Sequence, residues 1–140
     1  MSRIKRLWLS IREPRKIKAI YFVYYAIAAG TGLATLLWPP RSIEGALGAF
    51  LTTLWAAFIL GGGIASCVAV FPGRWWLERA GIYAILGGIL IYEGTVMFLQ
   101  FTETGNRLTQ FGVLLLATGL FIVRLIPISR YSFEPRPSWG

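Results

Sequence analysis

The chain has 140 residues, of which 56% are hydrophobic and only 14% are charged. Soluble domains carry about 25% charged residues, so this composition argues against a soluble enzyme and favours a chain whose apolar surface is covered by lipid. There is no histidine, and the single cysteine, Cys67, lies within an apolar run. A histidine-based catalytic site, a disulfide framework and a Cys/His metal site are thereby excluded, and we expect neither an enzyme nor a bound cofactor.

The first element in chain order is a basic segment, residues 1–16. Ile4, Leu7, Trp8 and Ile11 recur at helical spacing between lysines and arginines, a pattern that predicts an amphipathic helix on the inner membrane surface. A disordered basic tether that only fixes topology explains the composition equally well. In both cases the expected partner is anionic lipid rather than nucleic acid, because the charges flank apolar runs. The residues expected at lipid headgroups are Arg3, Lys5, Arg6, Arg12, Arg15, Lys16 and Lys18.

Residues 17–128 form the predicted transmembrane domain, with four apolar spans at about 19–38, 46–71, 77–101 and 108–128. Each has the roughly 20 residues that cross a bilayer as a helix. The fourth contains Arg124, which we expect to snorkel to the headgroups. The connections are short and rich in proline and glycine, so neighbouring helices should be antiparallel. The predicted fold is therefore an all-α integral membrane protein, an antiparallel bundle of four transmembrane helices. A cytoplasmic tail follows at 129–140, and its proline-rich part, residues 132–140, is expected to be extended or disordered.

Lysine and arginine are distributed unequally among the connections, which predicts the topology. The first and third connections have one arginine each, Arg41 and Arg107, whereas the N-terminal segment, the second connection and the tail hold most of the others. The positive-inside rule then places both termini in the cytoplasm. Glu44 and Glu78 follow the start of the second and third helices, where a negative charge interacts favourably with the helix dipole.

Glu93 is the strongest local signal for a site, because it lies within the third span. A carboxylate at that depth should face the bundle interior or water. Thr31, Thr52 and Thr53 reach a comparable depth, Thr118 lies somewhat deeper, and their hydroxyls are the expected partners. Two interpretations stay open: a proton- or cation-binding point, and a polar tie that fixes helix register.

Small residues at four-residue spacing form a second pattern. Gly62 with Ser66, and Ala84 with Gly88, have the spacing of a close helix-packing face. We expect this face to close the bundle on itself, and a contact between copies of the protein is the alternative.

Four segments together resemble a family of small four-span membrane proteins from tailed phages of actinobacteria, including mycobacterial hosts. They are REPRKIKAIYFVYY, WPPRSIEGALG, FPGRWWLERAGI and TGNRL, in ordered blocks over most of the chain. Members of that family are labelled membrane proteins or holins when their genes lie near lysis genes. The resemblance implies a phage protein of the host inner membrane, holin-like, which oligomerises to permit lysis.

Two alternatives belong to other functional classes. The first is a phage protein that blocks superinfection or modifies the envelope through a partner. The second is a small proton-coupled transporter using Glu93; the small multidrug transporters are similar in size, but their essential glutamate lies in the first span rather than the third.

Overall fold

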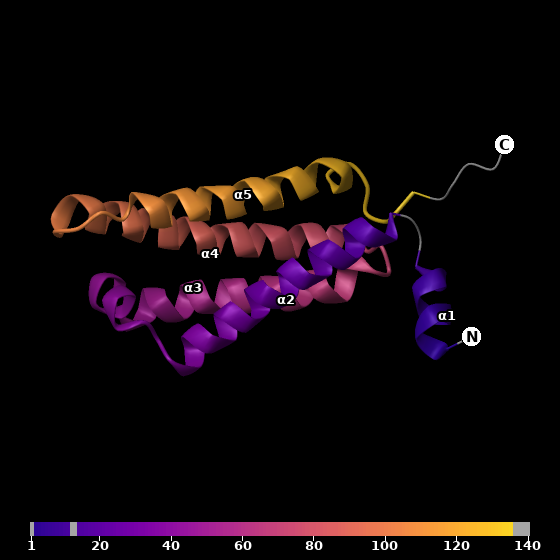
Figure 1. The fold of residues 1–140 in the computed structure, drawn as a ribbon, viewed down its shortest axis with the longest axis horizontal. Coiled ribbons are helices and arrows are strands. Elements are labelled where there is room, and N and C mark those ends of the chain that lie inside the picture. Colours follow the sequence, from indigo (N-terminus) through magenta and orange to yellow (C-terminus); the bar gives the residue numbers. More distant parts are fainter. Residues whose placement is uncertain (1, 12–13, 136–140) are drawn as a thin grey trace.

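The protein is described by a computed structural model, which places residues 2–11 and 14–135. Within these ranges the chain is entirely helical, with five helices and no strand (Figure 1). The helices are α1 (Arg3–Ser10), α2 (Arg15–Leu37), α3 (Arg41–Val70), α4 (Trp75–Thr102) and α5 (Leu108–Ile128). Four of them, α2 to α5, are long and apolar enough to cross a membrane. The prediction of an all-helical chain with four such helices is confirmed.

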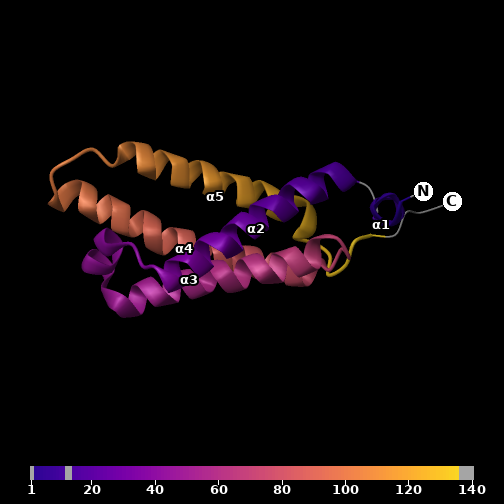
Figure 2. The same ribbon diagram turned by 60° about the horizontal axis from the view of Figure 1, so that its bottom comes forward.

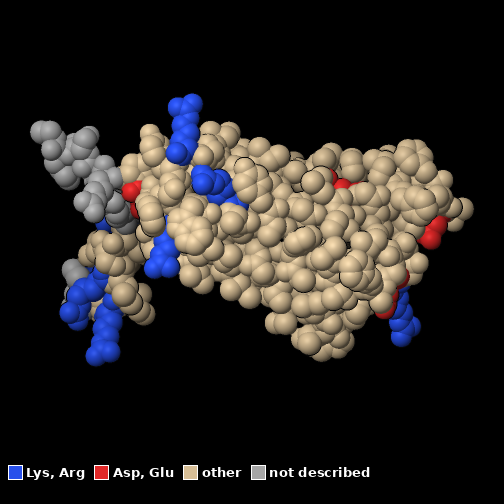
Figure 3. All heavy atoms as spheres, turned by 180° about the vertical axis from the view of Figure 1, so that it is seen from behind, with Lys and Arg blue, Asp and Glu red and all other residues tan. Residues whose placement is uncertain are grey.

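The connections lie at two opposite ends of the bundle (Figures 1 and 2). The 71–74 connection lies at one end with α1 and residues 129–135, and we call this the basic end. The 38–40 and 103–107 connections lie at the other, which we call the distal end. Figure 3 shows lysine and arginine side chains gathered at the basic end, on a surface whose middle is mostly uncharged. Large apolar side chains face outward along the bundle, such as Leu116, 77% exposed.

The helix α3 begins after Pro40 and has a sharp break at Gly48. Gly48 has φ 79° and ψ 162°, a conformation essentially restricted to glycine because it has no Cβ. The break separates the segment 41–47 from the long part of α3, and it lets Ile43, 5% exposed, pack in the core. The other end of α3 leads into Gly73, which also has a positive φ.

Glycines allow α3 to approach both α2 and α4 closely. A Cβ on Gly63 would lie 2.6 Å from the backbone nitrogen of Ala29 in α2. On another face of α3, a Cβ on Gly62 would lie 2.5 Å from the carbonyl oxygen of Gly81 in α4. Because small residues are what permit such backbone contacts in apolar surroundings, α3 is the central helix of the bundle.

The helices α2 and α5 meet only near the basic end. There the Tyr25 and Phe121 rings stack with centroids 6.2 Å apart, and the Tyr21 hydroxyl donates to the Leu120 carbonyl at 3.2 Å. Towards the distal end the two helices diverge (Figure 2). The α2–α5 side of the bundle is therefore open along part of its length.

The short helix α1 lies apart from the bundle at the basic end (Figure 1). Ser2 caps it by accepting a hydrogen bond from the Lys5 amide at 3.3 Å. None of its residues is buried, and Ile4 and Leu7 are 79% and 67% exposed. Of the two interpretations of this segment, the structure shows a helix, and its apolar side chains are exposed.

Candidate functional site

The most enclosed ion pair among the described residues joins Glu78 and Arg124. Glu78, in the first turn of α4, has no exposed surface, and Arg124, near the end of α5, is 6% exposed. Arg124 donates from Nε to Oε1 of Glu78 at 2.7 Å and from Nη2 to Oε2 at 3.0 Å. This two-point geometry is the strongest form of guanidinium–carboxylate contact.

Aromatic side chains of α2 complete the site. The Tyr25 hydroxyl donates to Oε1 of Glu78 at 2.6 Å, and Tyr25 itself has no exposed surface. The Tyr21 ring lies against the guanidinium of Arg124, 5.2 Å from centroid to Cζ, where the cation meets the negative face of the ring. The site thus joins α2, α4 and α5, and we call Tyr21, Tyr25, Glu78 and Arg124 the charged cluster.

The charged cluster corrects two expectations from the sequence. Arg124 does not snorkel to the headgroups, because its guanidinium is held inward by Glu78. Glu78 is more than a favourable charge at a helix N-terminus, since it also neutralises this buried arginine. The signal was present in the sequence: the start of α4 and the end of α5 lie at the same end of the bundle, so Glu78 and Arg124 have similar depth.

A second ion pair ties the C-terminal segment to the bundle. Lys18 of α2, 1% exposed, donates from Nζ to Oε2 of Glu134 at 2.7 Å. The Glu134 amide donates to the Gly73 carbonyl, and the Trp76 amide to the Ser132 carbonyl, both at 2.9 Å. Residues 129–135 therefore cross the basic end as an ordered strap. The described part of the stretch expected to be extended or disordered, residues 132–135, has an ordered, non-helical course.

The other cations expected at headgroups have different surroundings. Lys18 is buried and paired with Glu134, so its charge does not face the surface. Arg15 donates to the carbonyls of Ile11 and Leu9, at 2.5 and 3.1 Å, and so closes the end of α1. Arg12 lies outside the described residues. Of the cations expected at headgroups, those with exposed side chains are Arg3, Lys5, Arg6 and Lys16.

Glu93 lies between α4 and α5 and is 7% exposed. The hydroxyl that reaches it is that of Thr118, which donates to Oε1 at 2.8 Å. Thr52 and Thr53 instead donate to the carbonyls of residues 48 and 49, four positions earlier in their own helix, a common bond for threonine within helices. Thr31 belongs to the wall of a cavity that Glu93 does not line. The contact at Glu93 is therefore a single tie between two helices.

The small-residue pattern falls mainly on the contact between α3 and α4. Ser66 is fully buried, and its hydroxyl donates to the Glu78 carbonyl at 3.4 Å. A Cβ on Gly88 would lie 2.5 Å from Cγ1 of Ile59. Together with the contact of Gly62 with Gly81, these residues pack α3 against α4 within one copy of the protein. Ala84, the fourth residue of the pattern, is only half-buried.

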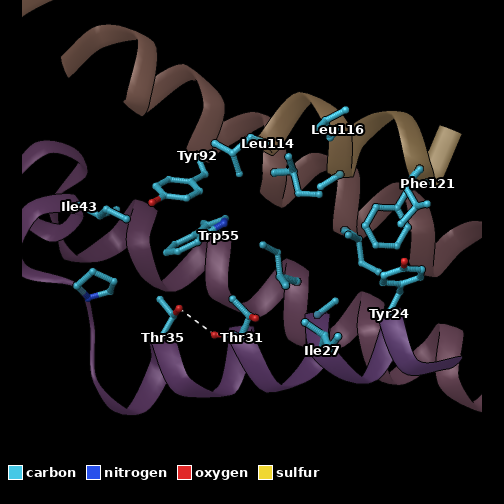
Figure 4. A pocket seen from close by; sticks show the side chains of 17 residues that line it. Tyr24, Ile27, Thr31, Thr35, Ile43, Trp55, Tyr92, Leu114, Leu116 and Phe121 are labelled. Carbon is cyan, nitrogen blue, oxygen red and sulfur yellow. Dashed lines mark hydrogen bonds between the residues drawn. The ribbon is translucent and has the colours of Figure 1, made fainter. Parts of the chain in front are cut away.

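A large apolar cavity lies between α2 and α5, with a volume of about 820 Å³. Figure 4 shows side chains from all four long helices lining it, with Ile27 on α2 and Phe121 on α5 among them. No charged residue lines it. The volume falls within the range of about 300–1,000 Å³ found for small-molecule pockets.

The described residues hold no group of three or more Cys, Asp or Glu side chains that could bind a metal ion. The acidic residues lie singly, and Glu78, Glu103 and Glu134 are each paired with a cation. Within residues 2–11 and 14–135, the polar side chains form ion pairs, the helices pack on one another, and the cavity has room for an apolar molecule. Comparisons with protein family models, with curated proteins and with solved structures give no match to this chain.

Proposed function

We propose that the chain is an antiparallel four-helix protein of a host inner membrane, with both termini in the cytoplasm. The charge distribution supports this orientation. Only Arg41 and Arg107, of the 14 lysines and arginines, belong to or directly follow the distal connections. The exposed basic helix α1 adds Arg3, Lys5 and Arg6 at the basic end, where anionic headgroups of the inner leaflet would attract them.

We further propose a holin-like function, in which copies of the protein associate laterally and open lesions. The observation that carries this proposal is the exposure of α5. Only Phe121, Arg124 and Ile128 of its 21 residues are buried. A Cβ on Gly112 or Gly119, seven positions apart, would meet no atom within 4 Å. Because small residues let apolar helices approach closely, this outward face of α5 suits a contact with a second copy.

The interior of a single copy offers no continuous polar path among the described residues. The charged cluster is closed by its own contacts, and Glu93 is bound to Thr118 at a separate place. A lesion would therefore form between copies. The same observations give no support to the proton-coupled transporter, because Glu93 does not line the cavity.

Timed expression in an actinobacterial host tests the proposal. We expect sudden loss of membrane potential, and lysis when an endolysin is co-expressed. Gly119→Leu should delay or abolish both by blocking the close approach of α5. Gly30→Leu is the matched control, because Gly30 of α2 also has open space around it and this variant should lyse on time. Resistance to superinfection with an intact membrane potential would contradict the holin function and favour the envelope-modifying alternative.

A further inference from the structure

The cavity between α2 and α5 has the length of one lipid chain. Along α2 its wall runs from Tyr24 to Thr35, which at 1.5 Å per residue is about 17 Å. One leaflet contributes about 15 Å of the hydrocarbon core. At the basic end the cavity stops at Phe121, whose ring is packed on Tyr25. It is thus a slot about one leaflet deep that starts near the distal end.

Polar groups occur in the wall mainly at the distal end. Figure 4 shows Thr35 and the Tyr92 hydroxyl near Ile43, at the opposite end from Tyr24 and Phe121. The Tyr92 hydroxyl accepts from the Gln110 side-chain amide, which leaves its own proton for a further acceptor. Trp55, 4% exposed, packs on Tyr92, and its indole N–H has no partner among the described residues. A buried donor without a partner is costly, so this indole N–H would gain from an acceptor close by.

The gap between α2 and α5 limits which kind of molecule can enter the cavity. Where α2 and α5 diverge, the slot faces the hydrocarbon at the level of Ile27 and Leu116, 58% and 77% exposed. A transmembrane helix of a second copy would have to run the full bilayer thickness, whereas the contacts of Tyr21 with Leu120 and of Tyr25 with Phe121 interrupt the cavity towards the basic end. A flexible chain of one leaflet's length fits without separating the helices.

We propose that this cavity holds one acyl chain of a phospholipid from the leaflet at the distal end. The chain enters between α2 and α5, and its terminal methyl group lies towards Phe121. The ester group lies beside Thr35 and Tyr92, where its carbonyl accepts a hydrogen bond from the Tyr92 hydroxyl. Since no charged side chain lines the cavity, the site recognises the chain and its ester rather than the headgroup.

Native mass spectrometry of the full chain tests the site. Protein purified in mild detergent and reconstituted with phosphatidylglycerol should retain one phospholipid per chain after detergent exchange. Ala28→Phe and Ala117→Phe fill the slot from α2 and from α5, and should retain none. Val113→Phe is the control: it is on α5, 61% exposed and outside the cavity wall, so it should retain the lipid. Phosphatidylethanolamine should be retained equally.

Two results would overturn the proposal. One is wild-type protein that loses all lipid under conditions that keep it folded by circular dichroism; the other is lipid retained equally by Ala117→Phe. A retained molecule without acyl esters, such as an isoprenoid quinone, would also refute it. If both phenylalanine variants fail to fold, photocrosslinking of wild-type protein to a diazirine-acyl phospholipid decides: labelling of Ile27 and Ala117 supports the site, and labelling confined to outward residues such as Val113 refutes it. These outcomes are independent of lysis.

Discussion

Removing the charge of Glu78 should destabilise the bundle strongly. In Glu78→Gln, the Arg124 guanidinium, 6% exposed, loses the carboxylate that it contacts at 2.7 and 3.0 Å. Breaking one partner of a buried ion pair costs about 3–5 kcal/mol, because the other charge is left uncompensated. The Tyr25 hydroxyl, which donates to the same carboxylate at 2.6 Å, keeps an amide oxygen as acceptor, so the loss is chiefly that of charge.

The assay is unfolding in mixed micelles, followed by circular dichroism as the denaturing detergent is increased. The double variant Glu78→Gln/Arg124→Met should lose less stability than Glu78→Gln alone, because replacing a whole buried pair is often close to neutral. As a control, Glu103→Gln breaks the pair with Arg107, whose side chains are 55% and 27% exposed, and should cost about 0–1 kcal/mol. Additive losses in the double variant would refute the coupling.

Three further predictions concern packing, the strap and the tie. Gly63→Leu should cost at least about 1–3 kcal/mol in the same assay because its Cβ meets the α2 backbone, whereas Gly30→Leu should stay within about 0.5 kcal/mol; equal losses would contradict the close approach. Glu134→Gln should weaken its bond to Lys18 and speed hydrogen exchange in residues 129–135; unchanged exchange would show that the ion pair does not hold the strap. Glu93→Gln should preserve stability and lysis timing, since an amide oxygen still accepts from a hydroxyl; loss of lysis alone would favour proton binding.

The helical architecture follows from features that are local in the sequence. Long apolar runs bounded by Pro39–Pro40 and Pro72–Gly73 leave little but helix as a way to satisfy the backbone in lipid. The break at Gly48 could not be predicted in the same way. Gly48 stands among other glycines in an apolar run, and only its φ of 79° distinguishes it from Gly61, which lies inside regular helix.

The charged cluster was missed because hydropathy treats each span separately. Within α4 alone, Glu78 is explained by the dipole of its own helix, and within α5 alone, Arg124 is explained by the nearby membrane boundary. Their pairing becomes apparent only when the depths of the two residues in the bundle are compared. Thr118, rather than Thr52, reaches Glu93 for a related reason: position along a helix gives depth, but the helix rotation decides which side chain faces the partner, and threonine has a ready acceptor four residues earlier in its own helix.

The central claim, that the chain crosses the membrane with both ends in the cytoplasm, is tested most directly by labelling single cysteines in intact cells. In a Cys67→Ala background, Asn106→Cys at the distal end should react with a membrane-impermeant maleimide. Ser132→Cys at the basic end should react only after permeabilisation. Labelling of Ser132→Cys in intact cells, or protection of Asn106→Cys, would contradict the proposed topology.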